Sequence, residues 1–251
     1  KVFRVLKELE VSQYPNENQP LGGYGAGVAI MLPDGNILSE KVGKTAGSPV
    51  DEVARIMDKK RYMNARLTKA SVLIGHVRYP SPGNMKNVET KETAQPYIGS
   101  FEPNLTVVSA HAGQVENYEE LKAKLKAHTF ESERLGFIDS EIIPHYFAEL
   151  FSAQADSDKA VYDLLSDLAG SNSAALLQVD SENAILHLIY KGKARGLTVW
   201  TNDDEEVIFC SRPEPIKEHL KPLLTDNKFK EKVIINWEEN AGLKLSFPAI
   251  F

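Results

Sequence analysis

Hydrophobic residues near the start of the chain recur at helical spacing. Val2, Val5, Leu6 and Leu9 fall on one face of a helix over residues 2–10. The pattern stops where a polar, proline-containing stretch follows, which is typical of a helix end. The sequence therefore predicts an amphipathic helix first.

Two extended patterns and a second helix come next. Residues 26–32 and 37–42 read as strands, and the sequence Pro-Asp-Gly-Asn between them is typical of a tight turn. These features predict a β-hairpin. Ser48 as an N-cap and Pro49 in the first turn then predict a helix that ends near Lys59.

The middle of the chain is helical and its end is rich in strands. Strand patterns at 71–76 and 105–110 are separated by a long polar connection, and such connections in compact domains often carry function. Helical patterns follow at 118–128, 140–151 and 157–168. The later strand patterns, with one short helix at 215–220 among them, are 173–179, 184–190, 197–201, 207–211, 233–237 and 243–247. Helices segregated from hairpin-joined strands predict an α+β layered fold, in a single domain over 1–251.

Composition narrows the class of protein. A chain of 251 residues with 42% hydrophobic content can bury a core. Its net charge of -6 gives no basic surface, so we expect no nucleic-acid partner. No apolar stretch approaches the roughly 20 residues that span a bilayer, and the first residues lack the apolar core of a signal peptide. These features predict a soluble, cytoplasmic protein without a membrane partner.

Cysteine and histidine usage bears on metal sites. Cys210 is the only cysteine, which excludes an intramolecular disulfide and a multi-cysteine metal cluster. The six histidines show no i, i+4 pair and no carboxylate set typical of a metal site. We therefore predict no metal and no cofactor.

Three segments combine an apolar strand end or helix start with polar groups: 78–81, 111–114 and 139–141. An arginine and an aspartate brought together could hold both ends of an α-amino acid, because a guanidinium takes a carboxylate as a bidentate fork and an aspartate takes an ammonium. By residue type alone, the favoured interpretation of Arg78 and Asp139 is structural, as an ion-pair partner and a helix N-cap.

Five motifs in order resemble the class II, or N-terminal nucleophile, glutamine amidotransferase domain. They are "GYGAGVAI", "IGHVRYPSPG", "AQPY", "AHAGQVENYEEL" and "IDSEIIPHYF", with weaker agreement at "VIFCSRPEPI". Such domains occur in glutamine phosphoribosylpyrophosphate amidotransferase and in the amidotransferase part of glutamate synthase. The resemblance implies a four-layer αββα sandwich, with two antiparallel sheets between helical layers.

The resemblance also implies roles for single residues. Arg78 falls where the family binds the glutamine α-carboxylate, and Asp139 falls where it binds the α-amino group. Tyr79 and Ser81 would line the pocket, and the backbone N–H of Gly113 would stabilise the oxyanion of the reaction. His76 and His111 lie in the same motifs, where we expect structural roles.

Two departures from the family concern catalysis. The family's nucleophile is an N-terminal cysteine on a first strand, whereas this sequence starts at Lys1 with the pattern of the following helix. We therefore expect that first strand and its connection, roughly 15 to 25 residues by ordinary element lengths, to be missing before Lys1; a nucleophile-free homologue is the alternative. Cys210 lies within an apolar strand pattern, where a free cysteine is usually a buried hydrophobe.

The second departure is Ala112, at the position where the family has the asparagine that donates to the oxyanion. Loss of one such donor costs roughly a hundred- to thousandfold in rate. The leading hypothesis is a glutamine amidotransferase domain that hydrolyses the amide of L-glutamine and passes ammonia to a synthase partner, for example a separate subunit of the split glutamate synthase kind. The alternative is a pseudo-amidotransferase acting as a glutamine-binding or regulatory module. Another N-terminal nucleophile hydrolase and assembly into a homo-oligomer stay open.

Overall fold

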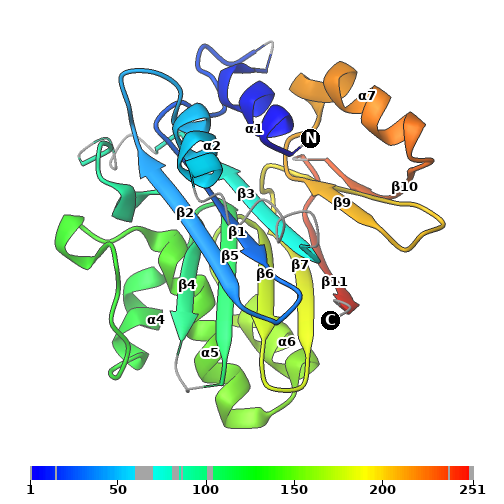
Figure 1. Ribbon diagram of the computed structural model, residues 1–251. Helices are drawn as coiled ribbons and strands as arrows, with labels where there is room; N and C mark the ends of the chain where they lie inside the picture. The colour runs from blue at the N-terminus through cyan, green and yellow to red at the C-terminus, as the bar shows by residue number, and fades with distance from the viewer. Residues whose placement is uncertain are drawn as a thin grey trace.

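The computed structural model describes residues 2–14, 16–59, 70–80, 85, 87–100, 104–236 and 238–248. Its helices and strands stack in layers, with two sheets face to face and helices outside each (Figure 1). No helix among the described residues is long and apolar enough to cross a bilayer.

The first sheet has the order β2-β1-β3 and is antiparallel throughout. Its strands are β1 (Gly25–Met31), β2 (Ile37–Gly43) and β3 (Val72–Val77). Alternate residues of β1 face opposite sides: Val28 and Ile30 pack with the helices, whereas Ala29 and Met31 pack with the second sheet. This strand is buried along its whole length because it is covered on both faces. The predicted β-hairpin is confirmed.

Helices α1 (Val2–Val11) and α2 (Pro49–Lys59) cover the outer face of the first sheet. Leu6 of α1 packs with Val53 and Met57 of α2 in this outer core. The buried Glu10 carboxylate accepts a hydrogen bond from the backbone N–H of Val50 at 3.0 Å. A carboxylate at the first turn of α2 opposes the positive end of the helix dipole, so this contact joins the two helices.

The second sheet has the order β11-β7-β6-β5-β4 and is also antiparallel. Its strands are β4 (Tyr97–Ser100), β5 (Thr106–Gly113), β6 (Asn172–Val179), β7 (Ala184–Gly192) and β11 (Ala241–Pro248). One face packs on the first sheet, through residues such as Val108 and Leu177. The other face packs under helices, through residues such as Val107 and Leu176.

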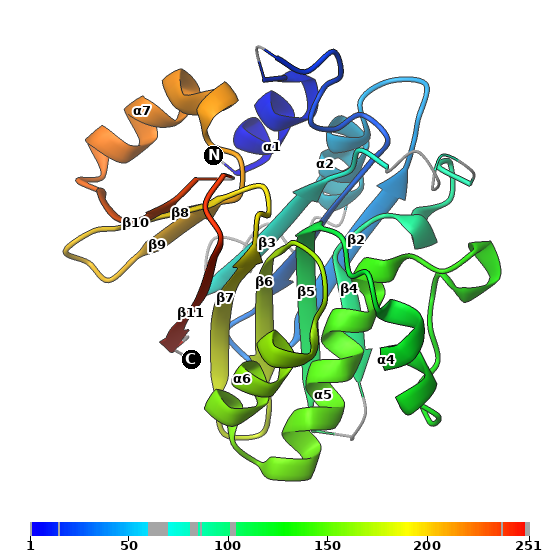
Figure 2. The same cartoon turned by 180° about the vertical axis from the view of Figure 1, so that it is seen from behind.

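The second sheet's outer face is covered by helices from the middle of the chain (Figure 2). These are α4 (Tyr118–Lys124), α5 (Ile142–Gln154) and α6 (Ser157–Asp167). Short 3₁₀ turns η2 (Lys91–Thr93), η3 (Glu133–Leu135) and η4 (Asp139–Glu141) stand in the connections. Helix, sheet, sheet and helix form the predicted αββα sandwich, and the α+β class is confirmed.

A small third sheet lies beside the first, with the order β10-β8-β9 (Figure 2). It consists of β8 (Leu197–Thr201), β9 (Val207–Cys210) and β10 (Lys230–Ile235). The turn η5 (Glu214–Ile216) and helix α7 (Lys217–Asp226) pack on it through Ile216 and Leu220, against Trp200.

Some predicted boundaries were wrong. The polar connection between the predicted strands 71–76 and 105–110 contains β4, which the sequence reading missed because four residues are too few for a periodic signal. The helix predicted over 118–128 ends at Lys124. The one predicted over 215–220 continues to Asp226. Residue 237, the predicted end of a strand, lies outside the described residues.

Candidate functional site

The predicted site residues line one cavity of about 1010 Å³. Those that the structure describes and that border it are Arg78, Tyr79, Ala112, Gly113 and Asp139. Ser81, predicted to line the same pocket, lies outside the described residues. Three segments that are far apart in the sequence thus meet at one surface, which a site for a small molecule requires.

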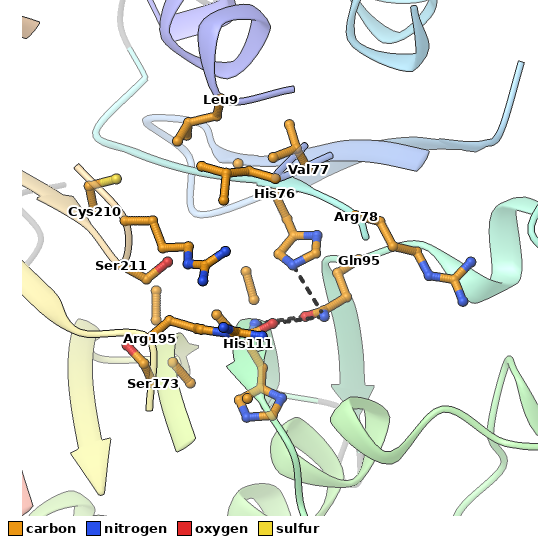
Figure 3. A pocket seen from close by; sticks show the side chains of 18 of the residues that line it. Leu9, His76, Val77, Arg78, Gln95, His111, Ser173, Arg195, Cys210 and Ser211 are labelled. Carbon is orange, nitrogen blue, oxygen red and sulfur yellow. Dashed lines mark hydrogen bonds between the residues drawn. The ribbon is translucent and has the colours of Figure 1, made fainter. Parts of the chain in front are cut away.

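Arg78 directly follows β3 and is held by backbone bonds to the adjoining strand. Its N–H donates to the carbonyl of Gly25 at 2.8 Å, and its carbonyl accepts from the N–H of Tyr24 at 3.0 Å. The side chain is 5% exposed, and Nη1 donates to the hydroxyl of Thr93 at 2.5 Å. Figure 3 shows the side chain extending past Gln95, away from Cys210 and Arg195. Burial lowers the pKa of Arg78, which an arginine tolerates while staying charged.

Tyr79 continues the wall of the cavity next to Arg78. Its ring meets the ring of Tyr24 edge-on, with centroids 5.1 Å apart and an angle of 75° between planes. This is a favourable geometry for aromatic pairs, so the Tyr24 ring fixes one side of Tyr79.

Gly113 ends β5 in a conformation that other residues rarely adopt, with φ at +149°. A Cβ atom there would overlap the carbonyl oxygen of Ser171, and that carbonyl also accepts from the N–H of Gln114 at 2.9 Å. Only glycine lets the two backbones approach this closely. Ala112, one residue earlier, is partly buried at the cavity wall.

Asp139 is the first residue of η4. One carboxylate oxygen, Oδ2, accepts a hydrogen bond from the backbone N–H of Val115 at 2.7 Å. The alternative interpretation of Asp139 as an N-cap is not what the structure has, because neither η4 nor α5 has a side-chain cap bond. The carboxylate instead ties η4 to the turn that follows Gly113.

The charged groups of the site act on a buried tyrosine, Tyr97. Burial raises the pKa of Tyr97 well above its ordinary value, Arg78 lowers that pKa, and Asp139 raises it. The Tyr97 hydroxyl donates to the carbonyl of Glu92 at 3.0 Å. The charges of Arg78 and Asp139 thus both act on the Tyr97 ring.

Sequence reasoning missed the role of Gln95. Its side-chain amide forms two hydrogen bonds with the backbone of His111, of 2.7 Å and 2.9 Å, and it also contacts the ring of His76 (Figure 3). Only the position of "AQPY" within the ordered motifs pointed to this residue. Burial, the nearby His111 and the Arg78 charge lower the pKa of His76 to about 3, so that its ring is neutral.

Cys210 also lines the cavity but is not activated. Burial raises the pKa of its thiol to about 12, so the nucleophilic thiolate is scarce at neutral pH. Its partly buried side chain packs with Trp200 and Ile216. Among the described residues, no group of three His, Cys, Asp or Glu side chains is arranged to hold a metal ion.

Two strand edges border the cavity. Leu73, Gly75, His76 and Val77 of β3 line it, as do all four residues of β9. In the part of the chain that the structure describes, β3 and β9 are each the last strand of a three-stranded sheet.

Comparison with known proteins gives concordant matches. The model of a family described as "Glutamine amidotransferase domain" matches residues 84–218. The chain is 31% identical over 232 residues to a glutamine–fructose-6-phosphate aminotransferase (isomerizing) of Staphylococcus epidermidis, with 90% of this chain and 32% of that protein covered. The corresponding enzyme of Chlamydia caviae is 29% identical over 167 residues, with 65% and 24% covered. The chain thus spans a quarter to a third of the length of these curated relatives.

Two solved structures share the fold. One is described as the allosteric regulatory enzyme of purine biosynthesis, with a TM-score of 0.56, 20% identity, and coverage of 86% of this chain and 40% of the other. The second is glutamine phosphoribosylpyrophosphate amidotransferase from B. subtilis in complex with ADP and GMP, with a TM-score of 0.52, 21% identity, and coverage of 90% and 43%.

Proposed function

The chain belongs to the glutamine amidotransferase domain family, and we propose that it binds L-glutamine, hydrolyses the side-chain amide and delivers the ammonia to a synthase partner. The observation that carries this proposal is the convergence of Arg78 and Asp139 on one cavity. We also propose that the protein acts in the cytoplasm, as the sequence predicts.

Arg78 would bind the α-carboxylate of glutamine, and Asp139 would bind its α-ammonium group. A guanidinium matches a carboxylate with two parallel N–H donors, and the low exposure of Arg78 strengthens its attraction for such a carboxylate because water screens it less. The bond from Nη1 to Thr93 supports this role, because it orients the guanidinium plane before a ligand arrives. Tyr79 and Ser81 would complete the pocket wall.

The backbone N–H of Gly113 would donate to the oxygen on which charge develops as the amide is attacked. Backbone donors that are fixed in place contribute strongly to such stabilisation. The close approach of Gly113 to Ser171 supports a rigid donor. Ala112 offers no side-chain donor, so this function rests on Gly113 alone.

The nucleophile would come from a further strand lying between β3 and β9. Such a strand would find a free edge of hydrogen-bonding groups on each side and would join the two three-stranded sheets into one. The cavity between these edges continues to Arg78 and Gly113, so the end of that strand would come beside the bound amide. This position suits the cysteine that the resemblance predicts upstream of Lys1.

The ammonia acceptor would be a synthase partner, as in a split glutamate synthase. The curated relatives named above are aminotransferases that act on fructose-6-phosphate, and this chain covers about a third of their length or less. Isolation of the complex tests both proposals: its subunit composition shows whether the acceptor is a separate subunit, and its mass shows whether the protein forms a homo-oligomer.

Calorimetric titration with glutamine and glutamate tests the binding step. Arg78→Ala is expected to weaken binding by about 30-fold or more, since loss of one partner of a buried charge pair costs roughly 2 to 5 kcal/mol. Arg55→Ala is the matched control, because Arg55 pairs with Glu52 on the surface of α2, outside the cavity. Equal affinities of wild type and Arg78→Ala would sink the assignment.

Ammonia release from glutamine tests the chemistry, in the present chain and in the chain extended upstream of Lys1 as encoded. Release that requires the extension would support the proposed strand. If glutamine binds but neither chain releases ammonia, the protein is a glutamine-binding module and not an enzyme.

A further inference from the structure

The pairing of β4 with β5 ends one step short of the proposed site. Tyr97 pairs with Ser109, and the same register puts Gln95 opposite His111. The strand β4 starts only at Tyr97, and Pro96 has no N–H to continue the pairing. His111 nevertheless needs partners on this side, because its backbone is buried.

The side chain of Gln95 takes the place of the missing backbone partner. Its Oε1 accepts from the N–H of His111 at 2.7 Å, and its Nε2 donates to the carbonyl of His111 at 2.9 Å. On the other side, His111 pairs with Ala174 of β6. The last residues of β5, which include Gly113, are thus held on both sides although β4 has ended.

The turn that carries Gln95 is itself fixed. Nζ of Lys41 donates to the carbonyl of Ala94 at 3.0 Å and to that of Pro96 at 3.3 Å, and it lies 4.4 Å from the centre of the Tyr97 ring. Because Gly27 of β1 has no side chain, the backbone carbonyl of Gln95 can approach this strand closely. The amide therefore extends from an anchored backbone rather than from a free loop.

Gln95 also reaches the other sheet. Its Nε2 lies 3.4 Å from Nε2 of His76, which is two residues before Arg78 on β3. The two bonds to His111 settle the orientation of the amide, so the group facing His76 is the NH₂ donor. His76 must accept through Nε2 and carry its proton on Nδ1.

A further hydrogen bond leads from His111 to η4. Nδ1 of His111 lies 2.9 Å from the hydroxyl of Ser140, which adjoins Asp139. Gln95, His111 and Ser140 are each at most 6% exposed. A line of hydrogen-bonded residues, His76–Gln95–His111–Ser140, therefore runs between the three segments that carry Arg78, Gly113 and Asp139. Gln95 meets the ring of His76 and the backbone of His111 (Figure 3), and the ring of His111 meets Ser140.

We propose that Gln95 is a positioning residue, and that the line His76–Gln95–His111–Ser140 sets the spacing of Arg78, Gly113 and Asp139 at which glutamine is held. Arg78 stands on one sheet, whereas Gly113 and the Val115 N–H that holds Asp139 follow a strand of the other. Side chains that cross between the sheets couple their positions directly. This inference rests on the proposed function, because it assigns the ligand to the same cavity.

Glutamine titration of Gln95→Met tests the proposal. Methionine has a similar volume and keeps none of the three hydrogen bonds. Its affinity for glutamine is expected to fall about tenfold or more, because small displacements of positioning groups have large effects. Gln178→Met is the matched control: Gln178 is 1% exposed, bonds Ser157 and His187, and does not line the cavity. Equal losses of affinity in the two variants would overturn the proposal.

Ser140 provides a second pair of variants in case Gln95→Met fails to fold. Ser140→Ala removes the hydroxyl that His111 contacts, whereas Ser140→Thr retains one. Weaker glutamine binding by Ser140→Ala, with affinity recovered in Ser140→Thr, supports a positioning role that a loss of stability alone would not produce. Wild-type affinity in Ser140→Ala would overturn the role of the line.

Nitrogen-15 NMR of the imidazoles separates this inference from the proposed function. In the wild type, His76 is expected to show an unprotonated Nε2 and a protonated Nδ1, and Gln95→Met should lose this preference. A wild-type protein with this signature but no affinity for glutamine would refute the proposed function and, with it, the assigned ligand, while the line itself stands. The opposite tautomer of His76 would refute the line whether or not glutamine binds.

Discussion

The carbonyl oxygen of Ser171 occupies the space that a side chain on Gly113 would need. Gly113 also has φ at +149°, so two independent constraints require glycine there. The overlap with Ser171 concerns packing between β5 and the segment before β6, whereas the positive φ concerns the conformation of the Gly113 backbone itself. They can be separated by experiment.

Gly113→Ala is expected to destabilise the fold by about 3 kcal/mol or more, because backbone strain of roughly 1 to 3 kcal/mol adds to the overlap with Ser171. Gly23→Ala isolates the strain, since Gly23 has φ at +95° with open space around it. Gly47→Ala, with open space and no positive φ, controls for the added methyl group. Urea unfolding of the three variants measures the differences, and equal stability of Gly113→Ala and Gly23→Ala would contradict the overlap.

Asp139→Asn is expected to weaken glutamine binding about tenfold or more while leaving the melting temperature nearly unchanged. Asparagine keeps an oxygen that can accept from the Val115 N–H, so the structural contact survives and only the charge is lost. Asp139→Ala, which loses both, should reduce affinity and melting temperature together. Calorimetry and thermal unfolding check both variants; unchanged affinity in Asp139→Asn would remove Asp139 from the ammonium site.

Ala112→Asn is expected to raise the turnover number about tenfold or more with little change in the KM for glutamine, in a chain that carries the predicted N-terminal cysteine. An oxyanion donor acts mainly in the transition state. Removal of one such donor lowers kcat by roughly a hundred- to thousandfold in other enzymes. Ammonia release from glutamine is the measurement. If the variant gains nothing in a chain that binds glutamine, another group already fills the oxyanion hole or the geometry is unproductive.

Cys210 is expected to react slowly with iodoacetamide at pH 8. Burial raises its thiol pKa to about 12, and a group below its pKa stays protonated, so the thiolate fraction is about a thousandfold lower than for an unburied cysteine. The rate should rise as the pH increases. Because the chain has one cysteine, mass spectrometry of the whole protein reports this thiol directly. Unfolding in urea should restore ordinary reactivity; fast labelling of the folded protein would contradict the burial effect.

Local patterns by themselves determined much of the fold. The hairpin of β1 and β2, the helix α2 and the amphipathic helix α1 were predicted within one or two residues. Each has a strong local signal, such as turn residues, an N-cap or a 3.6-residue period, and such signals do not depend on distant partners. The ordered motifs also named Arg78 and Asp139, whose roles stay predictions.

A short strand and the end of one helix could not be predicted from local sequence and became clear only from the tertiary structure. β4 has four residues with alternating burial, and only its pairing with β5 makes it a strand. Helix α7 continues beyond its predicted end at residue 220, because Leu220 and the partly buried Leu224 pack on the third sheet. In both cases long-range contacts decide the conformation, and a local window of sequence does not contain them.

The arrangement of the site was decided by tertiary structure alone. Gln95 lies in a turn with no periodic signal, yet the register of β4 with β5 puts it opposite His111 and lets its side chain complete the pairing. The cavity likewise depends on the tertiary structure, because it is bordered by the edge strands β3 and β9 of two different sheets. Residue types in the sequence specify which chemistry is available, whereas the distances between them follow from the packing of two sheets that are far apart along the chain.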